Sequence, residues 1–441
     1  MRFWAALLLV FCIAPPQAHA ELPPLRPEVE AHVIEVRAHN PALKDDVFAK
    51  MGGSSVESKA FLHCLATPYV DLAGRDDLQE TIDFFNVSRK NAFNRRSLSA
   101  GVSWNLRYAL GGRPANFRKE IRDSDARWAL VFFGANDAQN QNERIYLKRL
   151  VYLIEELEQM GVVPVLGAAS PRRGKTRDLW IQRFNAITEA VALHWNLPYV
   201  DYYDAMKVLP RRGLARDGVH PNVMGRGGAR AACQFTDAGL RYGNNVRNLM
   251  TLQVLDQLRR VASTAPVLDA HGEFDGQDLA EPEPEGLTEP LPVHHHVPSA
   301  VEDSDPNPDP GAAAAMATTA DSREVVVPAG LPFSEFVDKE TLPQGELPPG
   351  CGRLKPEARV LKVSVTVDEP TRLRAIALDL DGFSYRLFWI RQDPEGPRCV
   401  RRRNQALEVA AQPGLWDLII EVGERAASEG RMLVLVRRDA R

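Results

Sequence analysis

A serine that follows two glycines is the first feature of the sequence that could carry chemistry. In Lys50-Met51-Gly52-Gly53-Ser54-Ser55-Val56-Glu57, an apolar run leads into a tight turn and a predicted helix start. A helix N-terminus presents free N–H groups and the positive end of the helix dipole, and both favour negative charge on a nearby oxygen. Ser54 is therefore a candidate nucleophile. Taken alone, the segment is more typical of a helix cap, because Ser54 and Glu57 fit the capping-box pattern.

An asparagine after a second apolar run is the next candidate. The sequence Phe132-Phe133-Gly134-Ala135-Asn136-Asp137 ends a predicted strand in a turn. The side-chain amide of Asn136 can donate hydrogen bonds to a developing oxyanion, and a preorganised donor of this kind is typically worth about 2.7–4 kcal/mol. Asn and Asp are also common turn formers, so this segment taken alone indicates only a turn.

An aspartate and a histidine three residues apart complete the set. In Arg216-Asp217-Gly218-Val219-His220-Pro221-Asn222, the carboxylate of Asp217 can hydrogen-bond to the imidazole of His220 across a short loop. That bond would fix the tautomer of the imidazole and stabilise its protonated form. An isolated Asp-x-x-His pair is also compatible with a metal site or a surface loop. The order of the three segments is more informative than any one of them.

Together the three segments resemble the SGNH (GDSL-type) hydrolases, over roughly residues 45–235. Gly52-Gly53-Ser54 is similar to the Gly-Asp-Ser block that supplies the nucleophile of that family. Gly134-Ala135-Asn136-Asp137 matches the Gly-x-Asn-Asp block, and Asp217-Gly218-Val219-His220-Pro221 matches the Asp-x-x-His block. The resemblance implies Ser54, Asp217 and His220 as catalytic residues. It implies an oxyanion hole formed by the Ser54 N–H, the Gly101 N–H and the Asn136 side chain.

Two departures from the family pattern leave alternatives open. Gly53 stands where the family has Asp; that Asp is not the nucleophile, but Ser55 is adjacent to Ser54, and only the spacing from the glycines favours Ser54. Gly101 lies in Ser99-Ala100-Gly101-Val102-Ser103, where the second family block places an oxyanion glycine. Gly111 and Gly112 remain alternatives to Gly101.

The resemblance also implies a fold and an activity. The fold is a flavodoxin-like, doubly wound parallel sheet. The activity is that of a serine esterase, which hydrolyses carboxylic esters through an acyl-enzyme, with short acyl esters or acetyl groups on polysaccharides as plausible substrates. No metal or organic cofactor is implied. The alternative, motivated by Gly53, is a catalytically silent SGNH-like module that binds cell-surface glycans.

Strands and helices alternate in the first part of the chain, as a parallel sheet requires. The pattern predicts strands at 47–51, 128–133, 162–166 and 197–200, and a helix at 143–160 whose apolar residues recur at helical spacing. Active sites in such folds lie at the carboxyl ends of the strands. Two of the predicted strands end in the segments described above.

The composition then changes twice. Residues 264–323 form a predicted disordered linker: between 266 and 322 there are thirteen acidic residues and no Lys or Arg. Such a stretch cannot bury enough apolar surface to become ordered. The adjacent histidines His294, His295 and His296 lie in it and are expected to be solvated rather than metal-bound. Residues 324–441 carry closely spaced strand patterns with turn signals, which predict a β-sandwich. This domain is a candidate for binding glycan or protein.

The N-terminus and the overall charge bear on where the protein acts. Residues 1–20 read as a signal peptide, with Arg2, a short apolar core and Ala18-His19-Ala20 as the cleavage pattern. The hydrolase domain would then span residues 21–263 of an exported protein, periplasmic or extracellular. The formal net charge of −4 argues against a general nucleic-acid binder. No later stretch is apolar and long enough to predict a transmembrane segment.

Export bears on the cysteines, because oxidising compartments favour disulfides. Four cysteines remain after removal of the signal peptide, and four cysteines allow three connectivities. The pairs Cys64–Cys233 and Cys351–Cys399 would keep each bridge within one predicted domain. Four buried free thiols are the alternative.

Overall fold

The computed structural model describes residues 22–225 and 228–264 of the N-terminal part of the chain. Between 324 and 439 it describes the residues outside 328–332, 339–341, 343, 345–346, 349–350, 355–357, 380–384, 405 and 423–430. The predicted signal peptide lies outside the described residues. So do the three adjacent histidines and, apart from Thr264, the predicted linker.

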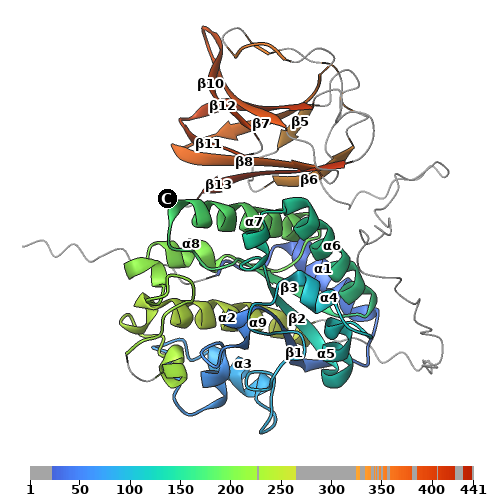
Figure 1. Cartoon of the computed structure of the whole chain (residues 1–441), viewed down its shortest axis with the longest axis vertical. Coiled ribbons are helices and arrows are strands. Elements are labelled where there is room, and N and C mark those ends of the chain that lie inside the picture. The colour runs from blue at the N-terminus through green and yellow to red at the C-terminus, as the bar shows by residue number, and fades with distance from the viewer. Residues whose placement is uncertain are drawn as a thin grey trace, which may run out of the picture.

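Four parallel strands form the centre of the N-terminal domain, residues 22–264 (Figure 1). They lie side by side in the order β1 (Lys44–Gly52), β2 (Ala126–Phe132), β3 (Val163–Gly167) and β4 (Tyr199–Val200). Every residue of β2 is buried. Because successive side chains of a strand point to opposite faces, Leu130 packs in one apolar cluster and Val131 in the other. Burial on both faces is typical of a parallel sheet covered by helices.

Helices cover both faces of this sheet. One face packs against α1 (Pro27–Ala38), α3 (Leu78–Phe85) and α9 (Gly243–Thr264). The other face packs against α4 (Leu106–Leu110), α5 (Asn116–Ser124), α6 (Glu143–Gln159) and α7 (Lys175–His194). The short helices α2 (Ser54–Glu57) and α8 (Tyr202–Lys207) directly follow β1 and β4. The predicted doubly wound parallel sheet is thereby confirmed.

A single backbone bridge extends the sheet beyond β1. Gly52 pairs in parallel with Ala100, on the edge of β1 that β2 does not occupy. Counting this segment as the second strand in sequence, the spatial order becomes 2-1-3-4-5, which is the flavodoxin-like order. Ligands of such sheets bind where the strand order reverses, outside the carboxyl ends of the first and third strands. In this chain those are the ends of β1 and β2.

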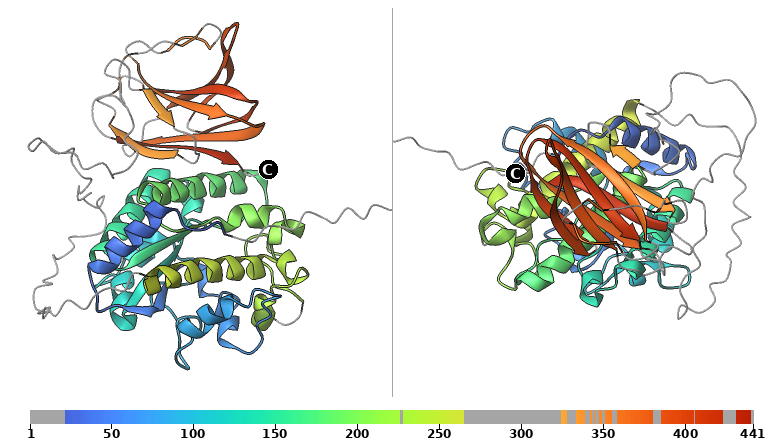
Figure 2. Two further views of the ribbon diagram at one scale, coloured as in Figure 1. Left: turned by 180° about the vertical axis from the view of Figure 1, so that it is seen from behind. Right: turned by 90° about the horizontal axis from the view of Figure 1, so that it is seen from above.

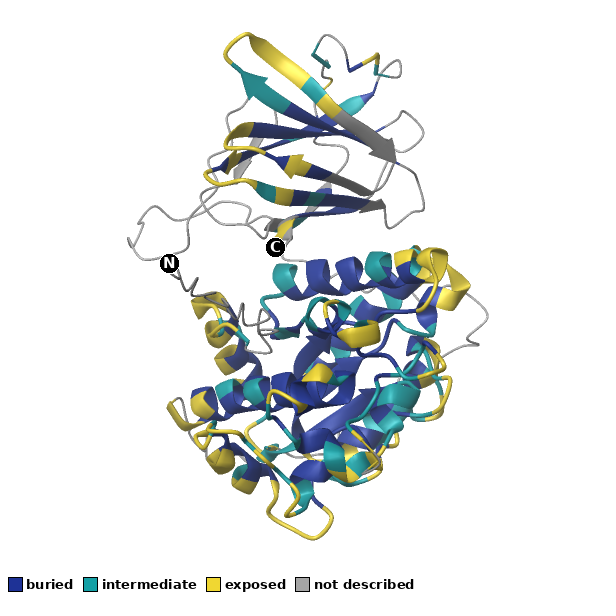
Figure 3. Ribbon diagram, turned by 90° about the vertical axis from the view of Figure 1, so that its left-hand side faces the viewer, coloured by how far each residue is buried: buried dark blue, intermediate teal, exposed yellow. Residues whose placement is uncertain are grey.

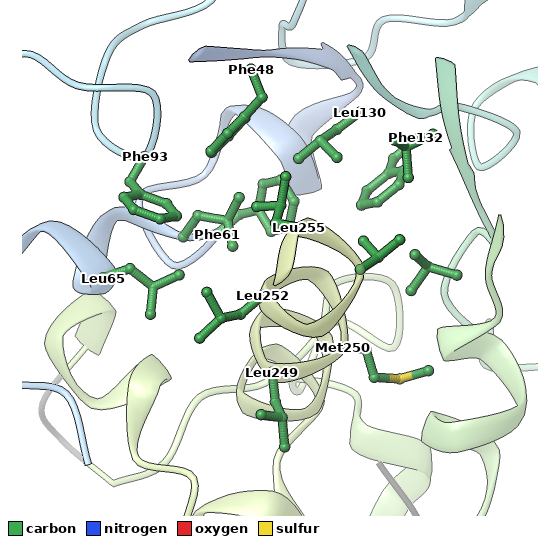
Figure 4. Close-up of a cluster of buried hydrophobic side chains, with 14 of the residues drawn as sticks. Phe48, Phe61, Leu65, Phe93, Leu130, Phe132, Leu249, Met250, Leu252 and Leu255 are labelled. Carbon is green, nitrogen blue, oxygen red and sulfur yellow. The ribbon is translucent and has the colours of Figure 1, made fainter. Parts of the chain in front are cut away.

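Helix α9 forms the centre of the core on its face of the sheet. Figure 4 shows Leu249, Leu252 and Leu255 of this helix among aromatic side chains from the sheet and from the segment after β1. Phe48, Phe61 and Phe93 belong to the same buried cluster. Because α9 is buried along most of its length, its polar residues must find partners inside the domain.

Residues 324–439 form two packed β-sheets. One sheet has the order β10 (Gly396–Asn404), β9 (Arg386–Asp393), β12 (Gly414–Val422), β7 (Arg359–Val367) and β5 (Glu324–Val327). The other has the order β11 (Ala406–Ala411), β8 (Thr371–Asp379), β13 (Arg431–Asp439) and β6 (Phe333–Asp338). Side chains of both sheets share one buried cluster that includes Tyr385, Trp389 and Trp416. The predicted β-sandwich is confirmed.

The sandwich lies on helix α7 of the N-terminal domain (Figures 1 and 2). Leu433 and Leu435 of β13 and Ile376 of β8 belong to the same apolar cluster as the buried face of α7. The hydroxyl of Ser334 on β6 donates to the carbonyl oxygen of Ala190, at 2.9 Å. Figure 3 shows buried residues along the helix beneath the sandwich. Helix α7 is therefore covered by the parallel sheet on one side and by the sandwich on the other.

The predicted elements of both domains are found close to their expected ranges. The predicted helix at 143–160 is α6, and each of the four strands predicted for the parallel sheet is present. The sequence pattern missed β5, β6 and β10, and β10 contains Pro397 and a run of arginines. As an end strand of its sheet, β10 tolerates both a proline and a polar sequence. Both predicted disulfides, Cys64–Cys233 and Cys351–Cys399, are present.

Candidate active site

Ser54 lies in the turn that follows β1. Gly52 ends the strand, and Ser54 opens the single-turn helix α2. An added Cβ on Gly52 would lie 2.4 Å from a methyl carbon of Val56 and 2.8 Å from the carbonyl oxygen of Phe132, so only glycine fits there. The first N–H groups of a helix have no partner within the helix. The turn thus presents the hydroxyl and the backbone N–H of Ser54 on the same side of the sheet.

The imidazole of His220 lies beside this hydroxyl. The distance between Ser54 Oγ and His220 Nε2 is 2.8 Å, across 166 residues of sequence. On the other side of the ring, His220 Nδ1 lies 2.8 Å from Oδ2 of Asp217. The structure therefore brings the three predicted catalytic residues into one hydrogen-bonded row. Ser55 does not take part in it: its carbonyl oxygen accepts a hydrogen bond from Arg247, at 2.8 Å.

Asp217 is held by its own loop. Its Oδ1 accepts from the backbone N–H groups of Val219, at 2.8 Å, and His220, at 3.0 Å. Partial burial raises the pKa of Asp217, but the hydrogen bonds from the His220 side chain and from these backbone groups outweigh it and lower the pKa to about 2. Asp217 is therefore ionised at any pH at which a histidine can act as a base.

Asn136 approaches the serine turn from the end of β2. Its Nδ2 donates to the carbonyl oxygen of Trp104, at 2.8 Å, and its Oδ1 accepts from Gln139. An added Cβ on Gly53 would lie 2.9 Å from Asn136 Nδ2 and 3.1 Å from the Trp104 oxygen. The glycine that replaces the family's Asp therefore leaves room for Asn136 to lie against the serine turn.

Asp137 fixes the turn that carries Asn136. This carboxylate is buried and accepts from the backbone N–H groups of Gly134 and Leu106, both at 3.1 Å. Burial raises the pKa of Asp137 to about 6, against the lowering effect of those hydrogen bonds. Asp137 thus ties the end of β2 to the start of α4, which is a structural role.

Gly101 does not fit the role that the resemblance implied for it. Its N–H donates to the carbonyl oxygen of Gly52, at 3.1 Å, as part of the bridge that extends the sheet. An N–H used in this way is not available to an oxyanion. The alternatives Gly111 and Gly112 border a separate groove with Arg107 and Tyr108. Gly101 therefore has a structural role in the sheet and not the predicted role in the oxyanion hole. Neither Gly111 nor Gly112 replaces it as a donor, because both lie at the separate groove.

A small pocket opens beside Ser54. Its volume is about 20 Å³, little more than the ~10–15 Å³ that one water requires. The lining residues come from the carboxyl ends of all four strands of the sheet and, for Val219, from the loop that carries His220: Gly53, Ser54, Ser55, Phe132, Phe133, Ala135, Asn136, Ala169, Ser170, Arg172, Tyr202 and Val219. No sequence motif marks Ser170, Arg172 or Tyr202, so these residues were not predicted. Only their positions shortly after the predicted strands, now β3 and β4, could have indicated them.

Neither a metal-ligand cluster nor a membrane-spanning helix is found among the described residues. Within these residues, no three His, Cys, Asp or Glu side chains are grouped so as to hold a metal ion. None of the described helices is both apolar enough and long enough to cross a bilayer.

Comparison with known proteins points to one family. Residues 79–227 match the sequence model of the GDSL-like lipase/acylhydrolase family. The matched range contains Asn136, Asp217 and His220, whereas Ser54 precedes it. No curated protein matches the chain.

Similar folds occur among solved structures. A GDSL-like lipase from Bacteroides thetaiotaomicron has 16% sequence identity and a TM-score of 0.32, covering 52% of this chain and 96% of its own. An acetylxylan esterase from Geobacillus stearothermophilus has 14% identity and a TM-score of 0.32, covering 47% of this chain and 93% of its own. The pre-peptidase C-terminal domain of a collagenase from Bacillus anthracis has 10% identity and a TM-score of 0.20, covering 27% of this chain and 99% of its own.

These likenesses are too distant to carry an argument, so the family assignment depends on the sequence match and on the fold. The match runs from α3 to beyond His220 and contains three of the four strands of the doubly wound sheet. Residues 79–227, which lie within the N-terminal domain, match the GDSL-like lipase/acylhydrolase family.

Proposed function

We propose that the N-terminal domain is a serine esterase that uses Ser54, His220 and Asp217 as a catalytic triad. The observation that carries the proposal is the continuous row of contacts Ser54 Oγ to His220 Nε2 and His220 Nδ1 to Asp217 Oδ2, both 2.8 Å. A nucleophile, a base and a group that orients the base within hydrogen-bond reach are the geometric signature of an activated serine.

The proposed reaction follows from this geometry. With the proton of the ring on Nδ1, His220 donates to Asp217 and its Nε2 accepts the proton of Ser54 as the serine oxygen attacks the ester carbonyl. The N–H of Ser54 and the side chain of Asn136 stabilise the oxyanion. His220 then protonates the leaving alcohol. A water molecule, deprotonated by His220, attacks the acyl-enzyme and releases the acid.

Esters with short acyl groups, including acetyl groups on polysaccharides, are the proposed substrate class. The resemblance of the sequence to the SGNH hydrolases and the match of residues 79–227 to an acylhydrolase family support this class.

Labelling with a fluorophosphonate probe tests the proposal, because the probe reacts only with an activated serine. The wild-type protein should be labelled and Ser54→Ala should not, with turnover of 4-nitrophenyl acetate reduced by about 10⁴-fold. Ser54 does not cap α2, because Gly53 holds the cap position and no side chain caps the helix, so the variant should still fold.

Ser55→Ala is the matched control and should keep its label. Loss of label in Ser55→Ala alone would mean that the nucleophile is one residue away from Ser54. If the wild-type protein is never labelled, a glycan-binding module replaces the esterase as the proposed function.

We further propose that the protein is exported and consists of a hydrolase domain (21–263), a linker (264–323) and the sandwich (324–441). The signal-peptide pattern of residues 1–20, the two disulfides and the acidic composition of the linker support this organisation. Mass spectrometry of the mature protein should find Glu21 at the N-terminus, and limited proteolysis should cut first between 264 and 323. An N-terminus at Met1 or first cuts within either domain would contradict the proposal.

A further inference from the structure

Buried arginines in the N-terminal domain differ in how their charge is balanced. Arg37 and Arg127 both pair with Asp45, at 2.7 and 3.0 Å, and Arg259 pairs with Asp256, at 3.1 Å. Arg172 is just as buried, with 9% of its surface exposed, yet no carboxylate among the described residues lies within ion-pair distance of its guanidinium. A buried charge without a partner is costly, which calls for an explanation.

Arg247 is the other buried arginine without a carboxylate; its Nε and Nη2 also lack hydrogen-bond partners, but aromatic rings surround its charge. Its guanidinium lies over the rings of Phe61, at 3.9 Å, and Tyr202, at 5.1 Å, and donates to the carbonyl oxygen of Ser55. Aromatic faces stabilise a cation in this geometry. Arg172 has no such rings and lines the pocket, which Arg247 does not.

Arg172 lies in the wall of the pocket beside Ser54. Its backbone is fixed, because the N–H donates to Asp178, at 2.8 Å, and the carbonyl oxygen accepts from Arg212, at 3.2 Å. Nη2 makes one long contact with the carbonyl oxygen of Ala135, at 3.4 Å. Nη1 is buried and has no hydrogen-bond partner. A buried donor group thus remains unused on a residue that lines the same pocket as Ser54.

The carboxylates nearest to Arg172 are already engaged. Asp178 accepts from Arg212, at 2.8 Å, and from the hydroxyl of Tyr203, also at 2.8 Å. Asp217 accepts from His220 and from two backbone N–H groups. Asp217 attracts Arg172 electrostatically but does not contact it closely enough to pair.

The two loops that supply Arg172 and Val219 to the pocket, here called its rim, expose basic side chains and one carboxylate, Asp217, although the whole chain has a net charge of −4. The loop after β3 and the loop that carries His220 are tied together by a hydrogen bond from the Arg173 N–H to the carbonyl oxygen of Gly218, at 2.9 Å. Between them these loops and the start of α7 expose five basic side chains: Arg173, Lys175, Arg177, Arg211 and Arg216. A cleft lined by one sign of charge attracts ligands of the opposite sign.

We propose that Arg172 is a specificity residue that binds a carboxylate on the ester substrate, within a few bonds of the scissile carbonyl. The inference depends on the proposed esterase function and narrows its substrate class to anionic esters. The planar guanidinium matches both carboxylate and phosphate groups. A carboxylate is the smaller of the two groups, and because Arg172 and Ser54 line the same pocket, an anion held by Arg172 would lie close to the bond that breaks.

Matched pairs of chromogenic esters test the proposal. Mono-4-nitrophenyl succinate and 4-nitrophenyl butyrate differ in a carboxylate on the acyl side. 5-Acetoxy-2-nitrobenzoate and 4-nitrophenyl acetate differ in a carboxylate on the alcohol side. In at least one pair the wild-type enzyme should prefer the anionic ester. Arg172→Met should lower that preference, measured as the ratio of kcat/KM values, by about tenfold to a hundredfold, mainly through KM.

Two variants distinguish recognition of the carboxylate by the guanidinium from a general effect of positive charge near the pocket. Arg172→Lys keeps the charge but not the planar fork, and should restore the preference only in part. Arg177→Met removes a positive charge from the rim and no donor from the pocket, so the ratio should change little. The proposal would be overturned if Arg172→Met lowered kcat/KM equally for both esters of a pair. It would also be overturned if Arg177→Met changed the ratio as much as Arg172→Met does.

Failure of this inference can be distinguished from failure of the proposed function. If the fluorophosphonate labels wild-type protein, succinate should slow the labelling in the wild type and much less in Arg172→Met. Labelling that succinate never slows, or that inorganic phosphate slows more strongly than succinate, would overturn the assignment to a carboxylate. If wild-type protein is not labelled at all, the esterase proposal fails first. Succinate binding by calorimetry, wild type against Arg172→Met, then tests the anion site directly.

Discussion

Two buried charges, Asp417 in the sandwich and Arg172 in the N-terminal domain, differ in how they are partnered. In the sandwich, the carboxylate of Asp417 is 1% exposed and contacts Ser364, at 2.7 Å, Lys362, at 3.4 Å, and Gln392. Beside Ser54, by contrast, Arg172 is buried with one long contact to a carbonyl oxygen. Buried charge that is fully partnered holds a fold together, whereas a buried charge with an unused donor is available for a ligand.

This contrast predicts that substitutions in the two domains will affect different quantities. Polar groups around the N-terminal pocket should govern turnover and contribute little to folding. The buried polar cluster around Asp417 should govern stability and leave turnover unchanged. The predictions below test that division, beginning with the largest expected effect.

Removal of the proposed base should have the largest effect on turnover. His220→Ala should reduce the hydrolysis of 4-nitrophenyl acetate by about 10⁴-fold, because no other group can take the proton from Ser54. His220 is half-exposed, so the midpoint of thermal unfolding should move little. A large loss of stability in this variant would break the comparison between the two domains.

The pH dependence of turnover in the wild type also tests His220 as the base. Turnover should fall as the pH is lowered into the range where an imidazole becomes protonated, since only neutral His220 can accept a proton. Asp217 cannot cause that fall, because its pKa of about 2 keeps it ionised throughout the range. A pH profile governed by a bound metal and abolished by chelators would contradict the scheme.

Restoring the family's aspartate should impair this enzyme. The Cβ of Gly53→Asp would lie 2.9 Å from Asn136 Nδ2 and so displace the proposed oxyanion donor. Loss of such a donor typically lowers kcat by about 10²–10³-fold. Gly53→Asp combined with Asn136→Ala should be little worse than Asn136→Ala alone, because both changes remove the same interaction. Independent, additive losses would show that Gly53 does not act through Asn136.

The sandwich should respond in the opposite way. Asp417→Ala leaves the buried hydroxyl of Ser364 without this acceptor and should cost about 1–3 kcal/mol in the free energy of unfolding of the sandwich. Asp393→Ala is the control: it removes a more exposed ion pair with Arg391, which is worth about 0–1 kcal/mol. Both variants should hydrolyse 4-nitrophenyl acetate like the wild type. Reduced turnover in Asp417→Ala would show that the sandwich supports the site through α7.

The sequence by itself determined the elements and most of the candidate catalytic groups. Alternation of apolar runs with helical periodicity fixes the parallel sheet, and residues within a few positions of one another fix the turns that carry Ser54, Asn136 and the Asp217–His220 loop. The cysteine pairs were predicted by keeping each disulfide within one predicted domain. These are local patterns, so they can be recognised without knowledge of the fold.

Only the tertiary structure decided how distant segments meet. It assigned the N–H of Gly101 to Gly52, made Gly53 the space that Asn136 needs, and covered α7 with the sandwich. It also placed Arg172, from the loop after β3, in the wall of the pocket beside Ser54. Such facts depend on which strand ends are neighbours in the sheet and on which partners remain free there. Neither property is encoded in any single stretch of sequence, because both arise from contacts between segments far apart in the chain.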